Sequence, residues 1–376
     1  MRVCVIGLRG IPDIPGGIET HCESLFERMA NSGQNLDVIV IGRTPYIGRK
    51  AFKTSSGIRV VPVAALQNKF LETISNTLLA IFWARFKAEA DMVHIHAIGP
   101  GLMSGLARLL GMQVVLTHHG DDFNRAKWNG FAKFVLRLGE RIGVTNAART
   151  IAVSPTLAQR LRDSYPSKAS CIQYVPNGAD HILGRALAAD GTAVLEKFGL
   201  ERDGYFVGVG RLVPEKGFAD LIRAHKASGS TLPLVIVGGS SHSDHEAELA
   251  ALAHNAVIMT GSLPQAEVAH LLAQARLFVM PSTHEGLPIA ALEAWAMNAP
   301  MLLSDIQPNR DLGLPSAHYF PAGDVETLSE LLAENGPGLP ALPLPGAFHW
   351  TSIANETAAI YESLDDAIPL DTSSPA

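Results

Sequence analysis

Short apolar runs alternate with helical patterns along the first half of the chain. Buried-strand signals occur at residues 3–6, 37–41, 92–96, 114–117 and 151–154. The spacing of apolar residues predicts helices over residues 18–31 and 102–110. Such alternation of strands and helices is typical of a parallel, doubly wound sheet whose two faces are covered by helices.

The same alternation starts again after a turn-rich connector at residues 175–178. Strands are predicted at residues 205–210, 234–237, 257–259, 277–280 and 301–304, and helices at 218–227, 246–254, 265–274 and 289–297. We therefore expect an α/β protein with two doubly wound parallel-sheet, Rossmann-like domains, over residues 1–175 and 176–350. A helix over residues 351–368 can cross back to the first domain, and residues 369–376 are expected to be disordered. Ligands of such sheets bind at the carboxyl ends of the strands, so a cleft between the two domains is the expected site.

Composition excludes several classes of protein. The 376 residues are 47% hydrophobic and 18% charged, which is inconsistent with a chain disordered throughout. No stretch reaches the roughly 18 uninterrupted apolar residues that a membrane-spanning helix needs. The amino terminus lacks the basic region, long apolar core and cleavage site of a signal peptide. The three cysteines form no C-x-x-C pair, which argues against a disulfide framework or a zinc ribbon. We therefore expect a cytoplasmic protein.

Charge is divided unevenly between the two halves of the chain. Residues 1–180 hold 21 Lys and Arg against 13 Asp and Glu, a net charge of +8. The remaining residues hold 9 against 23, a net charge of −14. The basic half is compatible with an anionic lipid surface or an anionic acceptor. Nucleic acid is not an expected partner, because no zinc-finger spacing or RNA-binding aromatic motif is present.

Two cations follow the predicted strand at residues 205–210. Arg211 and Lys216 precede Gly217, where the next helix opens. A helix amino terminus with an Arg and a Lys is suited to an anion such as a diphosphate. An exposed loop with two solvated cations is the alternative interpretation.

Two glutamates follow the predicted strand at residues 277–280. Glu285 lies in the loop before a helix, and Glu293 lies about two turns inside that helix. The backbone N–H groups of the loop and first turn are expected to point at an anion; they belong to Gly286, Leu287 and Ile289. A carboxylate beside such a cradle would repel phosphate, so we expect the glutamates to bind sugar or ribose hydroxyls.

These motifs resemble the retaining glycosyltransferases of family 4, which have the GT-B fold. Glu285 and Glu293 match the family's E-x7-E pair, residues 210–217 match G-R-L-x-x-x-K-G, and Asn177 with Gly178 matches the N-G of its connector. Further stretches resemble a bacterial rhamnosyl- and exopolysaccharide-type subgroup; they are residues 9–12, 16–19, 119–122 and 125–128. The resemblance runs in order from about residue 1 to residue 310.

The resemblance implies an activity and a role for each matching residue. It implies metal-independent transfer of a sugar, as a hexosyl group, from a nucleotide-diphosphate donor to a glycan or lipid-linked acceptor, with no cofactor and no metal site. The first domain would face the acceptor and the second would bind the donor. Glu293 would hold the ribose, and Glu285 would be a catalytic residue in contact with the donor sugar. Arg211 and Lys216 would neutralise the diphosphate. Gly16 and Gly17, lacking Cβ atoms, would let the backbone approach the donor phosphate.

The resemblance also implies a histidine at the reacting centre. The T-x-H-G spacing that begins at Thr117 favours His119 for this catalytic role, with His118 as the alternative. Asp122, Lys127 and Asn177 are secondary candidates, which could contact the acceptor. The family usually has Gly where Asn298 stands, and Asn tolerates left-handed backbone geometry well enough to end a helix there.

Other functions and a membrane contact stay open at this point. A GT-B nucleotide-sugar epimerase or hydrolase, a Rossmann dehydrogenase and a catalytically inactive sugar-binding protein are the alternatives. Apolar residues at spacings of three and four predict an amphipathic helix over residues 69–87, with cations near its ends. This helix either packs on its own domain's sheet or docks on the inner face of an anionic membrane, where a lipid-linked acceptor would lie.

Overall fold

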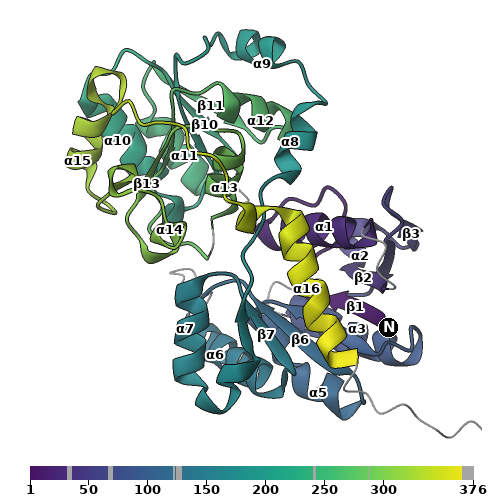
Figure 1. Ribbon diagram of the computed structural model, residues 1–376. Helices are drawn as coiled ribbons and strands as arrows, with labels where there is room; N and C mark the ends of the chain where they lie inside the picture. The colour runs from purple at the N-terminus through teal and green to yellow at the C-terminus, as the bar shows by residue number, and fades with distance from the viewer. Residues whose placement is uncertain are drawn as a thin grey trace, which may run out of the picture. The chain divides into compact units, whose positions relative to one another are not determined.

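The computed structural model describes residues 1–31, 36–66, 71–121, 123, 129–239, 243–286 and 288–365. The chain divides into two compact units (Figure 1). Unit 1 comprises Met1–Asn177 with Trp350–Ala376, and unit 2 comprises Gly178–His349.

Unit 1 is built on an eight-stranded sheet with the order β3-β4-β2-β1-β5-β6-β7-β8. Its strands are β1 (Arg2–Ile6), β2 (Asp37–Arg43), β3 (Phe52–Lys53), β4 (Arg59–Val63), β5 (Met92–His96), β6 (Gln113–His118), β7 (Arg149–Ala152) and β8 (Ile172–Tyr174). The short edge strand β3 runs antiparallel to β4, and the other pairings are parallel. The parallel strands are nearly continuous apolar runs because helices bury both faces of the sheet.

Helices cover the two faces of this sheet. They are α1 (Gly17–Ala30), α2 (Thr44–Ile47), α3 (Leu71–Phe86), α4 (Ile98–Gly101), α5 (Ser104–Leu109), α6 (Gly130–Asn146), α7 (Pro155–Ser164), the 3₁₀ turn η2 (Pro166–Cys171) and α16 (Trp350–Asp365). Right-handed crossovers place α1 on one face and α3 to α7 on the other. The last helix, α16, packs beside α1, as the yellow and purple helices of Figure 1 show.

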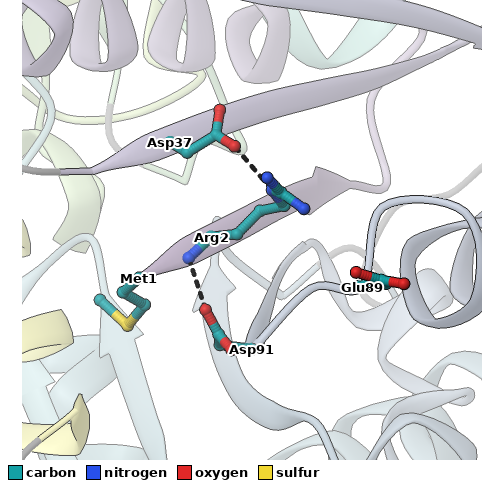
Figure 2. Close-up of a pocket in the computed structure, with 5 residues that line it drawn as sticks. All are labelled: Met1, Arg2, Asp37, Glu89 and Asp91. Carbon is teal, nitrogen blue, oxygen red and sulfur yellow. Dashed lines mark hydrogen bonds and ion pairs between the residues drawn. The ribbon is translucent and has the colours of Figure 1, made fainter.

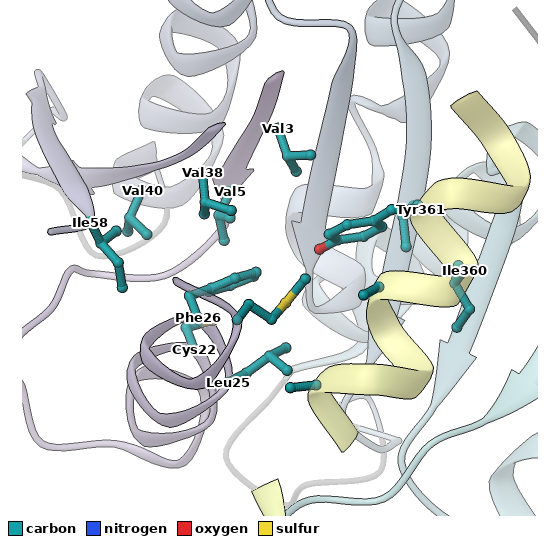
Figure 3. Close-up of a cluster of buried hydrophobic side chains, with 14 of the residues drawn as sticks. Val3, Val5, Cys22, Leu25, Phe26, Val38, Val40, Ile58, Ile360 and Tyr361 are labelled. Atoms are coloured by element: carbon teal, nitrogen blue, oxygen red, sulfur yellow. The ribbon is translucent and has the colours of Figure 1, made fainter. Parts of the chain in front are cut away.

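The core of unit 1 lies between β1, β2, α1 and α16 (Figure 3). Val5, Phe26 and Val40 are fully buried there, and Tyr361 of α16 reaches the same cluster. The Tyr361 hydroxyl also bonds Nδ1 of His94 at 2.5 Å. Burying a large apolar side chain stabilises a fold by roughly 1.5–3 kcal/mol, so α16 is an integral part of unit 1.

Unit 2 has a six-stranded, wholly parallel sheet with the order β11-β10-β9-β12-β13-β14. Its strands are β9 (Phe206–Val209), β10 (Leu234–Val237), β11 (Val257–Gly261), β12 (Leu277–Met280), β13 (Met301–Ser304) and β14 (Tyr319–Phe320). Its helices are α8 (His181–Ala186), α9 (Gly191–Phe198), α10 (Phe218–Ser228), α11 (Ser243–Leu252), α12 (Gln265–Ala273), α13 (Ile289–Ala296), α14 (Gln307–Arg310) and α15 (Val325–Leu332). The 3₁₀ turns are η3 (Pro214–Lys216), η4 (Ser316–His318), η5 (Ala333–Asn335) and η6 (Gly346–Phe348).

Each sheet contains a point where the direction of winding reverses. In unit 1 the chain winds outward in opposite directions from the neighbouring strands β1 and β5, and in unit 2 from β9 and β12. Helices on opposite faces then leave room beyond the carboxyl ends of those strands, where open α/β sheets bind ligands. The two-domain, doubly wound fold predicted from the sequence is confirmed, and the loops after these four strands are where a site is expected.

Candidate functional site

In unit 2, the loops that follow β9 and β12 are fastened to each other. The backbone N–H of Thr283 donates to the carbonyl oxygen of Glu215 at 2.9 Å. Gly217 has φ of 69°, and a Cβ atom on it would overlap the carbonyl oxygen of Pro281. This approach requires glycine, because a side chain would force the two loops apart.

The joined loops bring together two residues that the sequence singled out. Nζ of Lys216 donates to Oε1 of Glu285 at 2.5 Å, and the hydroxyl of Ser282 donates to the same oxygen at 2.8 Å. Both side chains of the ion pair are largely buried. Arg211, at the end of the β9 segment, is exposed. The loops therefore present one paired cation and one solvent-facing cation at the switch point.

Helix α13 starts next to Glu285. Its first intrahelical bonds run from Ala291 and Leu292 to the carbonyl oxygen of Pro288, so the N–H groups of Ile289 and Ala290 come before them. Pro288 is the N-cap residue, one position before the first residue of the helix. The amino terminus of a helix carries a partial positive charge and attracts anions. Leu287, a predicted donor contact, lies outside the described residues.

Glu293 lies inside α13 with 7% of its surface exposed. Its Oε1 is 3.1 Å from Nε2 of His181 at the start of α8. The histidine fixes the carboxylate in one orientation, which a hydrogen bond to a ligand hydroxyl would require. At the end of the helix, Asn298 has φ of 56°, so the expected left-handed geometry at this position is confirmed. Sequence reasoning missed His181, which has no motif of its own.

In unit 1, the loop after β1 leads to Gly16 and Gly17. Gly16 has φ of 155°, and a Cβ atom there would overlap the side chains of Arg9 and Glu19. Those two side chains form a two-point ion pair, with Nε–Oε1 and Nη2–Oε2 distances of 3.0 Å. Gly17 is the first residue of α1. The glycine at position 16 therefore makes room for a charge pair of the protein itself.

His118 and His119 have different environments although they are adjacent. His118 is fully buried, and its Nε2 lies 2.9 Å from Oε2 of Glu140 on α6. Glu140 also accepts hydrogen bonds from Arg160 and from the hydroxyl of Tyr165. Burial alone would raise the pKa of Glu140, but hydrogen bonds from His118 and Arg160 outweigh it and lower the pKa to about 2. His118 thus belongs to a buried charged network.

His119 belongs instead to a group of histidines beyond the ends of β5 and β6. Its Nε2 is 3.0 Å from Nδ1 of His96, and its ring meets the edge of the His21 ring at a centroid distance of 4.9 Å. His21 bonds the side chain of Asn177, with Nδ1 2.7 Å from Oδ1. The connector residue Asn177 is thereby tied to the same group as His119.

The histidines of this group are held neutral. Burial lowers the pKa of His21 to about 4 against the opposing effect of its hydrogen bond to Asn177, and burial lowers that of His94 to about 3. Burial also lowers the pKa values of His96 and His119 well below the usual value, helped by the neighbouring imidazoles. Desolvation disfavours the charged form of an imidazole, so neutral rings are expected at pH 7.

Three of these rings could also hold a metal ion. Ring nitrogens of His21, His96 and His119 lie within 4.8 Å of one another, and neutral imidazole is a common ligand of divalent transition metals. Among the residues the structure describes, Nε2 of His21 and Nε2 of His96 have no hydrogen-bond partner. A second group, His118 with Asp121 and Glu140, already has both carboxylates paired with Arg160.

Two secondary candidates, Asp122 and Lys127, lie outside the described residues.

A pocket lies at the opposite edge of the unit 1 sheet (Figure 2). It is lined by Met1, Arg2, Asp37, Glu89 and Asp91, at the amino ends of β1, β2 and β5. The Arg2 side chain bonds Asp37, with Nε 2.6 Å from Oδ2, and its backbone N–H donates to Asp91. Arg2 is thus already bonded to Asp37 and Asp91. The pocket also lies at the amino ends of the strands and not at their carboxyl ends, so it is not the candidate site.

In the described ranges, no helix has the length and hydropathy to cross a bilayer.

Two doubly wound units, each with a switch point at the carboxyl ends of its strands, define a class of ligand-binding α/β proteins. Residues 15–182 match the family described as Glycosyltransferase Family 4, and residues 193–334 match Glycosyl transferases group 1. The alpha-maltose-1-phosphate synthase of Mycolicibacterium smegmatis is 30% identical over 97% of this chain and 100% of its own length. The chain belongs to the family 4-like glycosyltransferases with the GT-B fold.

Solved structures have the same fold. Sucrose-phosphate synthase from Thermosynechococcus elongatus superposes with a TM-score of 0.80 at 19% identity, over 97% of this chain and 99% of that one. Anabaena HepE, solved in complex with UDP-glucose, gives a TM-score of 0.71 at 16% identity, over 97% and 100%. At these identities the likeness shows the fold alone.

Proposed function

We propose that this glycosyltransferase moves a hexosyl group from a nucleotide-diphosphate sugar to a glycan or lipid-linked acceptor, with retention of configuration and without a metal. We assign it to cell-surface polysaccharide synthesis at the cytoplasmic face, on the resemblance of residues 9–12 and 16–19 to the exopolysaccharide-type subgroup. The HepE structure, solved with UDP-glucose, supports a nucleotide sugar as donor. The observation that carries the proposal is the convergence of Lys216, Glu285 and the start of α13 at the unit 2 switch point.

In unit 2, each charged group has a task that matches its surroundings. Arg211 and Lys216 bind the diphosphate and stabilise the negative charge that grows on it as the sugar leaves. Before the donor arrives, Lys216 is paired with Glu285, so neither charge is left unpaired in a largely buried place. Glu285 then contacts the donor sugar, and Glu293, oriented by His181, holds the ribose hydroxyls.

In unit 1, His119 is the residue we assign to the reacting centre. Its ring is neutral at pH 7, since burial and neighbouring histidines lower its pKa, so it acts as a hydrogen-bonding group and not as a fixed positive charge. His118, locked to Glu140, has both ring nitrogens engaged, because Nδ1 accepts from the N–H of Gly120. This difference favours His119 over His118 for contact with substrate.

Donor binding tests the proposal directly. Thermal unfolding is measured with UDP-, GDP- and dTDP-sugars, because a ligand of the native state at about 100 times its Kd adds roughly 2.7 kcal/mol of stability. One nucleotide is expected to raise Tm, and Glu293→Gln to abolish most of the rise. Glu330→Gln, which changes an exposed glutamate of α15 in the same unit, is the matched control.

The products then separate this proposal from its alternatives. NMR of the anomeric proton is expected to show a transferred sugar with the donor's configuration. Donor consumption that is equal with and without acceptor would indicate a hydrolase or epimerase, and binding without turnover would indicate an inactive sugar-binding protein.

A further inference from the structure

Helix α3 carries an apolar stripe on its outer side. Ala80, Ile81 and Ala84 are buried against the unit, whereas Phe82 and Phe86 are 40% and 63% exposed. The rings of Phe82 and Phe86 stack with a centroid distance of 6.2 Å. The predicted helix in this stretch is confirmed over the described residues, and the rings of Phe82 and Phe86 are exposed on its outer side.

Helix α6 carries a second such stripe, which the sequence did not indicate. Phe131, Phe134 and Leu138 are 76%, 61% and 37% exposed. The exposed cations Arg137 and Arg141 lie among them at spacings of three and four, which puts them on the same side of the helix. The single acidic residue of α6, Glu140, is buried in its ion pairs. The outer side of α6 is therefore aromatic and purely cationic.

The two helices belong to one layer on the same face of the sheet. Helix α3 connects β4 to β5, and α6 connects β6 to β7, and both connections run in the same direction across the sheet. Right-handed crossovers in one direction place their helices on the same face. Helix α4 contacts both α3 and α6. At one end Nε of Arg85, on α3, donates to the carbonyl oxygen of Leu110, next to α5, at 2.9 Å. Ser104 of α5 donates to the carbonyl oxygen of Ile142 of α6 at 3.0 Å. We call the outer side of this layer the α3–α6 face, defined by Phe82, Phe86, Phe131, Phe134 and Leu138.

We propose that the α3–α6 face docks on the surface of an anionic lipid bilayer, with its phenylalanine rings at the level of the headgroups and Arg137 and Arg141 on lipid phosphates. The inference deepens the proposed function, because a lipid-linked acceptor would then lie at the surface that unit 1 occupies. Helices with aromatic and aliphatic residues beside cations lie in the interfacial plane of a membrane. Large exposed apolar side chains on neighbouring helices of one layer are typical of an interaction surface.

Charge decides between a bilayer and a second copy of this chain. A symmetric dimer through the α3–α6 face would bring the same patch of each copy together, so Arg137 and Arg141 would face α3 or α6 of the second copy. The one acidic residue of α3, Glu72, is already paired with Arg43. No exposed acidic side chain of α6 is available to pair with them among its described residues. An anionic bilayer supplies the missing negative charge and also accepts the rings.

Vesicle binding by the full chain tests the inference. Co-sedimentation is measured with phosphatidylcholine vesicles and with vesicles that also contain phosphatidylglycerol. Wild-type protein is expected to bind the anionic vesicles, to ignore the neutral ones, and to dissociate when salt rises from about 0.1 M to about 1 M. Equal binding to both vesicles, or no binding at low salt, overturns the inference.

Variants locate the binding surface. Arg137→Glu with Arg141→Glu is expected to weaken binding by about 25-fold or more, because each cation near an anionic surface contributes about fivefold. Phe82→Ser with Phe86→Ser, and Phe131→Ser with Phe134→Ser, should each weaken it by about tenfold through lost apolar burial. These paired serine variants change exposed rings, and circular dichroism checks that each variant is folded.

The matched control lies in unit 2. Leu183→Ser with Leu187→Ser removes two exposed leucines of similar size from the segment of α8, and vesicle binding is expected to persist. Loss of binding in this control equal to that of the α3 or α6 variants overturns the inference. So does a dimer on size exclusion that the same α3 and α6 variants abolish, because a second copy would then cover the face.

The outcome is separable from that of the proposed function. Donor binding is measured on the same variants by the thermal shift without vesicles, and it is expected to equal that of the wild type. Vesicle binding that fails while the nucleotide shift stands refutes docking alone. A missing nucleotide shift with intact vesicle binding refutes the proposed donor chemistry alone.

Discussion

The two units share a doubly wound parallel sheet, yet they place different chemistry at their switch points. In unit 2, largely buried groups of opposite charge are paired, as Lys216 is with Glu285. In unit 1, buried imidazoles are held neutral by desolvation, as His21 and His96 are. The same strand ends can therefore carry either a site for a charged group or a dry, uncharged one. Only the residues after the strands determine which site forms, and fold alone does not assign function.

The largest expected effect is that acid destabilises unit 1 more than unit 2. An ordinary histidine pKa is 6.5, and burial lowers those of His21 and His94 to about 4 and about 3, with His96 also well below. Between pH 6.5 and pH 4 the unfolded chain therefore binds protons that the folded unit does not bind. The free energy of unfolding is at its full value above pH 6.5 and decreases as the pH is lowered. Three such protons give a slope of about 4 kcal/mol per pH unit at the lower end of this window.

Hydrogen exchange read by mass spectrometry during an acid titration checks this order of unfolding. Unit 1 is expected to lose protection before unit 2, in which burial lowers the pKa of His225. The Glu140 pKa of about 2 places the loss of its ion pairs below this window. Unit 2 opening first, or unit 1 unchanged down to pH 4, would show that the histidines are not desolvated as described.

The charged network of unit 1 should show the next largest effect. Glu140→Ala leaves Arg160 and His118 without their shared carboxylate in a largely buried place. Removing one partner of a buried pair costs about 3–5 kcal/mol, and urea unfolding followed by circular dichroism measures the loss. Glu362→Ala, on an exposed side of α16, is the control. Equal midpoints for the two variants would mean that the network adds nothing to stability.

Substitutions at the two switch points are expected to change different kinetic parameters. His119→Ala is expected to lower kcat by about 10²-fold, the usual cost of a lost transition-state hydrogen bond, whereas Glu293→Ala should mainly raise KM. The reverse pattern contradicts the assignment. His118→Ala is expected to act through stability, since Glu140 loses a partner; a larger kcat loss there than at position 119 would move the catalytic role to His118.

Much of the fold was predictable, because buried parallel strands are continuous apolar runs. Helix α6 was missed because Gly139 and Gly143 lower its helix propensity. Both glycines lie where α6 packs closely against α4. A Cβ atom on Gly139 would overlap the carbonyl oxygen of Ile98 on α4, and Gly143 lies against Gly101. Tertiary contact between α4 and α6, and not local preference, therefore determines that helix.

The candidate site was predictable only where a motif is local. Lys216 and Glu285 both follow strands, and the structure brings them together. The bond between His21 and Asn177 spans 156 residues, and no sequence pattern links the two. The alternation His94-Ile95-His96 did carry a signal, since residues two apart on a strand share a face. Roles for Glu285, Glu293 and His119 remain predictions that kinetics must test.

Chelation should have the smallest effect, and it tests whether the histidine group of unit 1 holds a metal ion. If the diphosphate is neutralised by Arg211 and Lys216 alone, EDTA leaves the transfer rate unchanged, because no step needs a divalent ion. If a metal binds at His21, His96 and His119, EDTA lowers the rate and Mn²⁺ restores it. His21→Phe separates these cases, because it removes a ligand while the unit 2 cations stay in place. Any metal requirement would contradict metal-independent transfer. A requirement that persists in His21→Phe would place the ion elsewhere, whereas one that is lost with His21 would assign the ion to the histidine group.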